Sequence, residues 1–320
     1  MNYGLPYQGS KNRIAKRLVD ALPAAPVLYD IFCGGCAVTH AAMLSGKYQR
    51  FVVTDLRGWL PDAFRKAITG GYAHEDRWIS REDFERLKST DAYAAMCFSF
   101  GNDTRSYMYA RGLEPYKRAL HYAIFWKDIA PWAELCPETA DALAAGLAPI
   151  EDRKQRRVQA GHFIIESLKA QLAAEMLTPD ILDKPIYRQI RRPENSHQSL
   201  QSLWSLERLQ SLERLESLPG ALTAHSGDYR ELCFDEPGVI YCDPPYKDTA
   251  DKSKDYADTS FDTESFYSWC GRQALPVYIS EYQMPEDRFV CIAEWDKVTT
   301  MASKTTNHVT ERLWRPRTQL

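Results

Sequence analysis

The stretch GVIYCDPPY, residues 238–246, joins a short apolar run to an acidic residue and two prolines. Its β-branched and aromatic residues predict a strand that is buried on both faces, as in a parallel sheet. Asp243 then stands at the carboxyl end of this strand. Because ligands of open α/β sheets bind at that edge, the stretch predicts both a fold class and the place of a binding site.

Similar apolar runs lie near both ends of the chain, and a long helix-like middle separates them. The runs cover residues 27–32, 51–55, 275–280, 288–293 and 311–314. We expect an α/β fold in which a mostly parallel sheet is flanked by helices. Residues 1–58 and 225–320 would form this discontinuous domain, and residues 59–224 would form a largely helical insertion.

Leucine recurs at every third position of a Leu-rich segment within the insertion, residues 199–218. The leucines are Leu200, Leu203, Leu206, Leu209, Leu212, Leu215 and Leu218. A three-residue step slips by roughly 60° per repeat on an α-helix, so the pattern does not predict a coiled-coil seam. It predicts either a connector that is locally packed or partly disordered, or a small solenoid-like piece.

Composition narrows the class of protein. The chain has 320 residues, of which 26% are charged, and a net charge of -3. No apolar run approaches the roughly 20 residues that cross a bilayer, and the first residues lack an apolar signal core. We therefore expect a cytoplasmic protein with no membrane segment, in which the cysteines are reduced. The histidines show no metal-ligand spacing, so no metal is expected.

The tetrapeptide Asp243-Pro244-Pro245-Tyr246 has a chemical logic of its own. The Asp243 carboxylate and the Pro244 carbonyl can both accept hydrogen bonds from one amino group. The two prolines stiffen the turn, and Tyr246 offers a ring face. The tetrapeptide therefore suits a planar amine, although a proline turn that only caps a strand would look the same in isolation.

A second candidate site follows another predicted strand, where residues 30–36 read DIFCGGC. Gly34 and Gly35 lie in a strand-to-helix turn, at which the backbone approaches a ligand closely. In nucleotide-binding α/β folds, an acidic residue about 20 residues beyond such a turn holds ribose hydroxyls. Asp55 ends the next predicted strand at this separation, which indicates an adenosine-containing cofactor.

Taken in order, six segments resemble the motifs of Dam-like, α-group DNA adenine methyltransferases, in a form often found in phages and prophages. They are residues 7–15, 30–38, 55, 226–229, 240–246 and 279–285. The resemblance implies a Rossmann-like methyltransferase fold with a target-recognition insertion. It also implies methyl transfer from S-adenosyl-L-methionine to the 6-amino group of a flipped-out adenine in double-stranded DNA, with site-specific or relaxed specificity.

The same resemblance assigns roles to individual residues. The catalytic set that holds the target base would be Asp243, Pro244, Pro245 and Tyr246. The cofactor-binding set would be Tyr7, Lys11, Asp30, Phe32, Gly34, Asp55 and Asp228. In this set Asp55 binds the ribose and Asp228 lies near the adenine of the cofactor. The insertion matches the family poorly, so the recognition sequence does not carry over.

A chain of negative net charge must concentrate its contacts with a polyanion. Residues 184–192 interleave Tyr187 with basic side chains. We expect Arg188, Arg191 and Arg192 to contact the phosphates of double-stranded DNA, bound by a monomer.

Two alternatives stay open at this point. The enzyme would methylate adenine in RNA, or the chain would be a catalytically inactive, DNA-binding relative. The second alternative requires a damaged site, whereas the acidic, aromatic and glycine positions are intact in this sequence.

Overall fold

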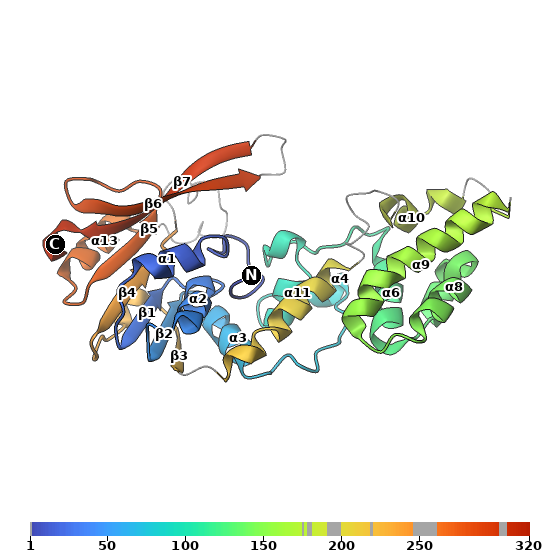
Figure 1. Cartoon of the computed structure of the whole chain (residues 1–320), viewed down its shortest axis with the longest axis horizontal. Coiled ribbons are helices and arrows are strands. Elements are labelled where there is room, and N and C mark those ends of the chain that lie inside the picture. The colour runs from blue at the N-terminus through green and yellow to red at the C-terminus, as the bar shows by residue number, and fades with distance from the viewer. Residues whose placement is uncertain are drawn as a thin grey trace. The chain divides into compact units, whose positions relative to one another are not determined.

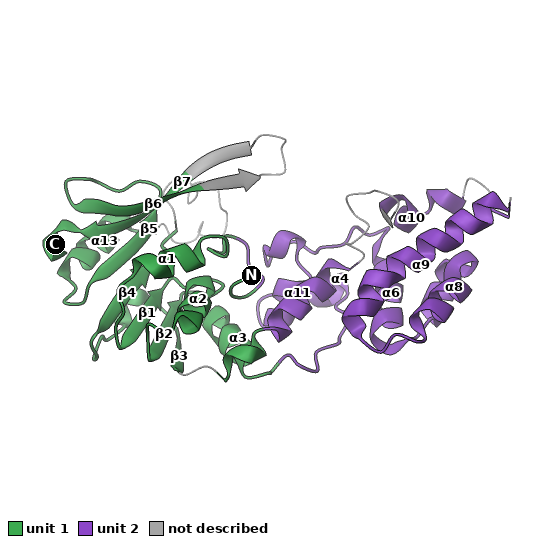
Figure 2. Ribbon diagram, in the orientation of Figure 1, with its two compact units in different colours: residues 1–5, 9–71, 212–320 green, residues 6–8, 72–211 purple. Residues whose placement is uncertain are grey.

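The chain forms two compact units in the computed structural model (Figure 1, Figure 2). Unit 1 comprises Met1–Leu5, Gly9–Gly71 and Leu212–Leu320, and unit 2 comprises Pro6–Gln8 and Tyr72–Ser211. The structure describes residues 2–174, 176–177, 181–190, 200–217, 220–245, 261–300 and 306–320, without the side chains of residues 190, 297–300 and 306–309. Within this part of the chain, no helix is both long and apolar enough to span a bilayer.

A seven-stranded, mostly parallel sheet forms the centre of unit 1, in the order β3-β2-β1-β4-β5-β7-β6. The strands are β1 (Val27–Ile31), β2 (Arg50–Asp55), β3 (Ala221–Ser226), β4 (Gly238–Cys242), β5 (Val277–Glu281), β6 (Phe289–Thr300) and β7 (Thr306–Pro316). Strands β1 to β5 pair in parallel, whereas β7 runs antiparallel to β5 and β6. The expected α/β, Rossmann-like class is confirmed.

Helices cover both faces of this sheet. Unit 1 contains α1 (Ala15–Ala21), α2 (Ala37–Ser45), α3 (Trp59–Ile68), α13 (Thr263–Arg272) and the 3-10 turns η4 (Glu213–Leu215), η5 (Tyr229–Glu231) and η7 (Arg317–Gln319). Side chains alternate between faces along β1. Ile31 packs in one core with Phe266 of α13. Asp30 points the other way and accepts hydrogen bonds from the N–H and hydroxyl of Thr39 in α2.

The borders of the units differ from the expected borders of the insertion at 59 and 224. Helix α3 and strand β3 belong to unit 1. Strand β3 has the sequence ALTAHS and lies at the edge of the sheet, where most of its side chains are exposed. An edge strand of small and polar residues carries no apolar run, so the sequence pattern did not mark it.

Unit 2 is largely helical in its described residues and contains one isolated β-bridge, between Ser99 and Tyr107. Its elements are α4 (Arg81–Leu87), α5 (Ala92–Cys97), η1 (Phe100–Asn102), α6 (Glu114–Trp126), α7 (Ala130–Leu135), α8 (Pro137–Leu147), α9 (Arg153–Ala173), η2 (Ile181–Asp183), α10 (Pro185–Ile190) and α11 (Gln201–Gln210). Trp132 of α7 is fully buried, and its indole N–H donates to the hydroxyl of Thr139 in α8 at 3.0 Å. The predicted helical character of the insertion agrees with this unit.

The Leu-rich segment forms α11 in unit 2 and η4 in unit 1. Six leucines of the repeat are buried: Leu200, Leu203, Leu206, Leu209, Leu212 and Leu215. From Leu200 to Leu209 the leucines spread over roughly half of the helix circumference. A 3-10 turn has three residues per turn, so Leu212 and Leu215 share one face of η4. The segment is therefore locally packed, as the first alternative predicted, and Leu218 lies outside the described residues.

Candidate active site

The carboxyl ends of β1 to β5 meet at one edge of the sheet in unit 1. The parallel register pairs Ile31 with both Thr54 and Cys242, and it pairs Asp55 with Ser226. In the sheet, β2 and β3 follow β1 on one side, whereas β4 and β5 lie on the other side of β1. The strand order therefore reverses its direction between β1 and β4. The edge between β1 and β4 is thus a topological switch point, where open α/β sheets bind ligands.

The glycine turn after β1 is tied to the end of β2. Positive φ angles occur at Phe32 (61°), Gly34 (47°) and Cys36 (53°). The backbone N–H of Gly34 donates to Oδ2 of Asp55 at 2.9 Å, and the N–H of Arg57 donates to Oδ1 at 2.9 Å. Burial raises the pKa of Asp55, and these two N–H groups oppose that shift.

The Asp55 carboxylate fits a ribose-bearing cofactor. An ionised carboxylate offers about four lone-pair sites, so the hydrogen bonds from Gly34 and Arg57 leave acceptor capacity for hydroxyl groups. The side chain is half-buried and stands beside the glycine turn. This donor and acceptor arrangement suits the ribose of S-adenosylmethionine.

The other residues expected at the cofactor differ in their surroundings. Asp30 is buried, and burial raises its pKa to about 7 against the hydrogen bonds from Thr39. The ring of Phe32 packs against Tyr229, which follows β3, with a centroid distance of 5.0 Å. Tyr7 belongs to the short segment of the chain that clusters with unit 2.

Asp228, which follows β3, is held by a neighbouring arginine. Its carboxylate pairs with the guanidinium of Arg230 at 2.5 Å and also accepts a hydrogen bond from the N–H of that residue at 2.9 Å. The hydrogen bond from the Arg230 side chain lowers the pKa of Asp228. Asp228 is therefore a charged group with a fixed orientation at the carboxyl end of β3.

Asp243 forms the centre of a cluster of charged side chains. The ammonium of Lys11 lies 2.6 Å from Oδ1 of Asp243 and 3.6 Å from Oε1 of Glu311 in β7. Lys11 is 7% exposed and Glu311 is 0% exposed. Burial alone would lower the pKa of Lys11, but the carboxylates of Asp243 and Glu311 raise it above the ordinary value.

Pro244 and Pro245 line a small pocket after β4. Its other walls are Phe261, Thr263, Phe266, Tyr267, Ile279, Glu281 and Met284. Burial raises the pKa of Glu281 to about 7, and the charge of Asp243 acts in the same direction. The pocket thus combines aromatic walls with one acidic group. Tyr246 lies outside the described residues.

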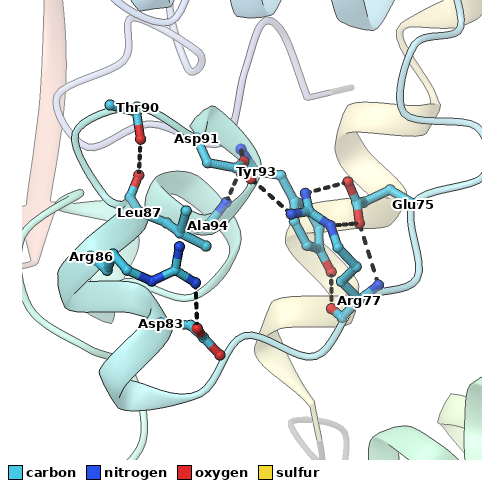
Figure 3. Close-up of polar contacts among 9 residues, drawn as sticks. All are labelled: Glu75, Arg77, Asp83, Arg86, Leu87, Thr90, Asp91, Tyr93 and Ala94. Atoms are coloured by element: carbon cyan, nitrogen blue, oxygen red, sulfur yellow. Dashed lines mark hydrogen bonds and ion pairs between the residues drawn. The ribbon is translucent and has the colours of Figure 1, made fainter.

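Several arginines of unit 2 are neutralised by neighbouring acids, as Figure 3 shows. Arg77 donates to the carboxylates of Glu75 at 2.7 Å and Asp91 at 2.9 Å. Arg86 donates to Asp83 at 2.7 Å. Arg77 is engaged by two acids and is a poor candidate for a phosphate contact, whereas the exposed pair of Arg86 with Asp83 is weak.

An open pocket in unit 2 has a different character. It is lined by Trp78, Ser80, Arg111, Glu114, Pro115 and Arg118. Arg111 and Arg118 are exposed, and neither has a hydrogen bond or ion pair within the described part of the chain. The Glu114 carboxylate is already engaged by the N–H of Arg81 at 2.9 Å. The pocket therefore has two cations at its rim whose charge no neighbouring acid in this part of the chain neutralises.

The aromatic wall of this pocket contains a further donor. The indole of Trp78 stacks on Tyr109 with a centroid distance of 5.5 Å and an interplanar angle of 12°. Its Nε1 is buried and has no acceptor among the described residues.

The predicted phosphate-binding stretch, residues 184–192, is largely engaged where it is described. Lys184 pairs with Glu138 at 2.8 Å, and Tyr187 is fully buried. Arg188 pairs with Asp183 at 3.1 Å, but both side chains are well exposed, so this pair is weak. Arg191 and Arg192 lie outside the described residues.

The structure adds groups to which the sequence patterns assigned no role. Arg111 falls in an aromatic and basic stretch, residues 107–111, which was a usable signal. Glu281 and Glu311 stand within or beside apolar strand runs, where an acidic residue is unusual. The pairing of β4 with β5 brings Glu281 toward Asp243, and the pairing of β5 with β7 brings Glu311 toward Lys11. Among the residues that the structure describes, no group of potential metal ligands gathers.

The mostly parallel sheet with its flanking helices is consistent with a Rossmann-like methyltransferase fold. Residues 7–120 match the sequence profile of the family described as D12 class N6 adenine-specific DNA methyltransferase. The match supports an adenine-specific DNA methyltransferase enzyme, and it includes the glycine turn and Asp55. A comparison with curated proteins finds no match.

Proposed function

We propose that the chain is a Dam-like, α-group enzyme that transfers a methyl group from S-adenosylmethionine to the 6-amino group of a flipped-out adenine in double-stranded DNA. The observation that carries this proposal is the position of Asp243, Pro244 and Pro245 directly after β4. The neighbouring strand β1 leads into the glycine turn, which is hydrogen-bonded to Asp55 at the end of β2. A cofactor and an amine bound at these two strand ends would be neighbours at the switch point.

The exocyclic amine of adenine is a weak nucleophile, because its lone pair is delocalised into the ring. S-adenosylmethionine, when bound, supplies an electrophilic methyl group on a sulfonium centre. Asp243 and the Pro244 carbonyl would accept hydrogen bonds from the amine, which orients its nitrogen and favours a pyramidal geometry. As the nitrogen gains the methyl group it must lose one proton, and the Asp243 carboxylate would accept it.

Cofactor binding is proposed for Asp55, Gly34, Phe32, Asp228 and Lys11, with Tyr7 and the buried Asp30 as further members of the set. Asp55 has acceptor capacity for the ribose. Asp30 supports the position of α2 below the glycine turn through Thr39. Tyr246 is proposed to stack on the flipped base.

Contacts with the DNA backbone are proposed for Arg111 and Arg118 of unit 2, in addition to Arg188, Arg191 and Arg192. Phosphates are bound mainly by arginine and lysine side chains whose charge is not already neutralised. Arg111 and Arg118 meet this condition within the described residues, and the Trp78 indole adds a neutral donor. A monomer that acts in the cytoplasm fits these features.

The proposal is tested by expressing the chain in a methylase-deficient host and sequencing modified bases on a resident plasmid. We expect N6-methyladenine, either at one short sequence or at many sites. Purified protein should also methylate duplex DNA in preference to RNA of the same sequence. Preference for RNA would favour the RNA alternative, and the absence of any methylation by folded protein would favour the inactive relative.

A further inference from the structure

Glu311 is a fully buried carboxylate that the proposed chemistry does not yet use. It lies in β7, and Leu313, two residues further along the strand, is equally buried. Residues two apart in a strand face the same side of the sheet, so Glu311 occupies a position that would ordinarily be apolar. Burial of a carboxylate is unfavourable unless a cation compensates its charge.

Strand β7 holds Glu311 in a defined place. It pairs with β5 through Ser280 with Leu313 and Glu281 with Arg312. The indole N–H of Trp314 also donates to the carbonyl oxygen of Glu281 at 3.0 Å. These contacts fix β7 beside the end of β5, which is the edge that carries the candidate active site.

The Lys11 ammonium lies between Glu311, at 3.6 Å, and Asp243, at 2.6 Å. We propose that Glu311 is a positioning residue for methyl transfer: it holds Lys11 against Asp243 and thereby fixes the orientation of the carboxylate that receives the target amine. This inference rests on the proposed function of Asp243. Replacement of a buried ion pair by apolar residues is often neutral for stability, so a gain in folding free energy does not explain the arrangement.

The titratable groups around Lys11 come from four strands. Asp243 after β4, Glu281 and Tyr282 at the end of β5, and Glu311 in β7 act on Lys11 directly, whereas Asp30 in β1 and Tyr241 in β4 act on Asp243. Acids predominate in this set, and the charge of Glu311 helps to keep Lys11 protonated by raising its pKa. Loss of that charge should therefore let Lys11 lose its proton at lower pH.

The test compares Glu311→Gln with the wild-type enzyme in single-turnover methyl transfer across a pH series. We expect the rate of methyl transfer to fall by about 10-fold to 100-fold, as for small misplacements of reacting groups. We also expect the alkaline limb of the profile to move to lower pH, with the KM for cofactor and DNA little changed. Glu294→Gln is the matched control, because Glu294 is an exposed acid on β6 that pairs with Arg312. It should behave like wild type.

A double variant, Lys11→Met with Glu311→Leu, guards against a simple loss of folding. It should keep a cooperative thermal transition and yet lose methyl transfer. A wild-type rate and an unmoved alkaline limb in folded Glu311→Gln would overturn the inference, as would a defect confined to the KM for the cofactor. An active Asp243→Ala enzyme would instead overturn the proposed function itself, so the two failures are distinguishable.

Discussion

Asp55 accepts a hydrogen bond of 2.9 Å from the backbone N–H of Gly34, so the acid that ends β2 holds the glycine turn that follows β1. Removal of Asp55 therefore withdraws a proposed ribose ligand and loosens the turn next to it. Hydrogen bonds to charged groups contribute about 1.5–3 kcal/mol each.

We expect Asp55→Ala to weaken S-adenosylmethionine binding by at least about 10-fold, which corresponds to about 1.4 kcal/mol. DNA affinity should change little. Calorimetry with the cofactor and gel shifts with a duplex measure the two effects. Asp62→Ala, which removes an exposed acid paired with Arg65, is the control. Equal losses of cofactor and DNA affinity would count against a ribose contact.

The role of Asp243 predicts a loss of catalysis without a loss of folding. Asp243→Ala should reduce kcat by about 10²–10³-fold or more, because the amine loses a charged acceptor. Transfer of a tritiated methyl group to DNA measures this loss, and circular dichroism measures folding. Asp235→Ala, at an exposed position before β4, is the control. Activity of Asp243→Ala close to that of the control would refute the assignment.

The buried acids Asp30 and Glu281 predict an unusual dependence of stability on pH. Burial raises the pKa of each to about 7, from ordinary values of 3.8 and 4.5. Between those values the folded state binds more protons than the unfolded state, so these groups make the free energy of unfolding fall as pH rises. Their contribution to stability is complete below the ordinary pKa and is lost as pH rises to about 7. A tenfold difference in proton affinity between the two states corresponds to about 1.4 kcal/mol.

Glu281→Gln should remove part of this decrease in the free energy of unfolding with rising pH. Urea unfolding at about pH 5 and about pH 7.5 measures it as the change in unfolding free energy between the two conditions. We expect a smaller decrease in the variant than in the wild type. Glu264→Gln, at an exposed acid on α13, should leave the decrease unchanged. A decrease of wild-type size in Glu281→Gln would show that Glu281 ionises normally.

Phosphate contacts by Arg111 and Arg118 predict a change in the salt dependence of DNA binding. Each phosphate that a cation neutralises adds about 0.9 to the magnitude of the slope of log affinity against log salt. Arg111→Ala and Arg118→Ala should each lower this magnitude by about 1, for cognate and random duplexes alike. Arg188→Ala tests the predicted contact on α10 in the same way.

Arg77→Ala is the matched control, since Arg77 is an exposed arginine of unit 2 that is paired with both Glu75 and Asp91. Fluorescence anisotropy across a salt series gives the slopes. Unchanged slopes at Arg111 and Arg118 would mean that the pocket beside Trp78 faces solvent in the complex. Loss of affinity for the cognate duplex alone would mean that an arginine reads a base.

The buried leucines of the repeat predict large effects on stability. Leu209→Ala in α11 and Leu212→Ala before η4 should each lower the free energy of unfolding by about 2–5 kcal/mol, as for other fully buried leucines. Both side chains are 0% exposed, whereas Trp204 of α11 is 58% exposed. Trp204→Ala should therefore have a small effect. Small losses at both leucines in chemical denaturation would contradict the observed burial.

Much of the fold was predictable because buried strands leave an apolar signature. The run at 238–242 matched β4 at both ends, and Cys242 is buried in the core as expected. The runs at 288–293 and 311–314 marked only parts of β6 and β7, which extend further as an antiparallel hairpin. A hairpin strand beyond the core gains its hydrogen bonds from its partner, and its side chains need not be apolar.

The candidate site was only partly predictable for a different reason. Asp55 and Asp243 stand at strand ends beside recognisable turns, so local sequence marks them. Glu311 follows Asp243 by a long stretch of chain, and its contact with Lys11 depends on the pairing of β7 with β5. No local pattern specifies that contact. Arg77 has acidic partners, whereas Arg111 and Arg118 have none among the described residues. This difference arises from the folding of unit 2, so local sequence does not predict it.

The leucine repeat crosses from unit 2 into unit 1 between Ser211 and Leu212 without a change in its spacing. A genetic crossover between two copies of such a repeat alters its length in whole multiples of three residues. The recombinant chain keeps a leucine at every third position on either side of the junction. A change of length in whole repeats at the border between the two units therefore preserves the spacing of leucines on both sides.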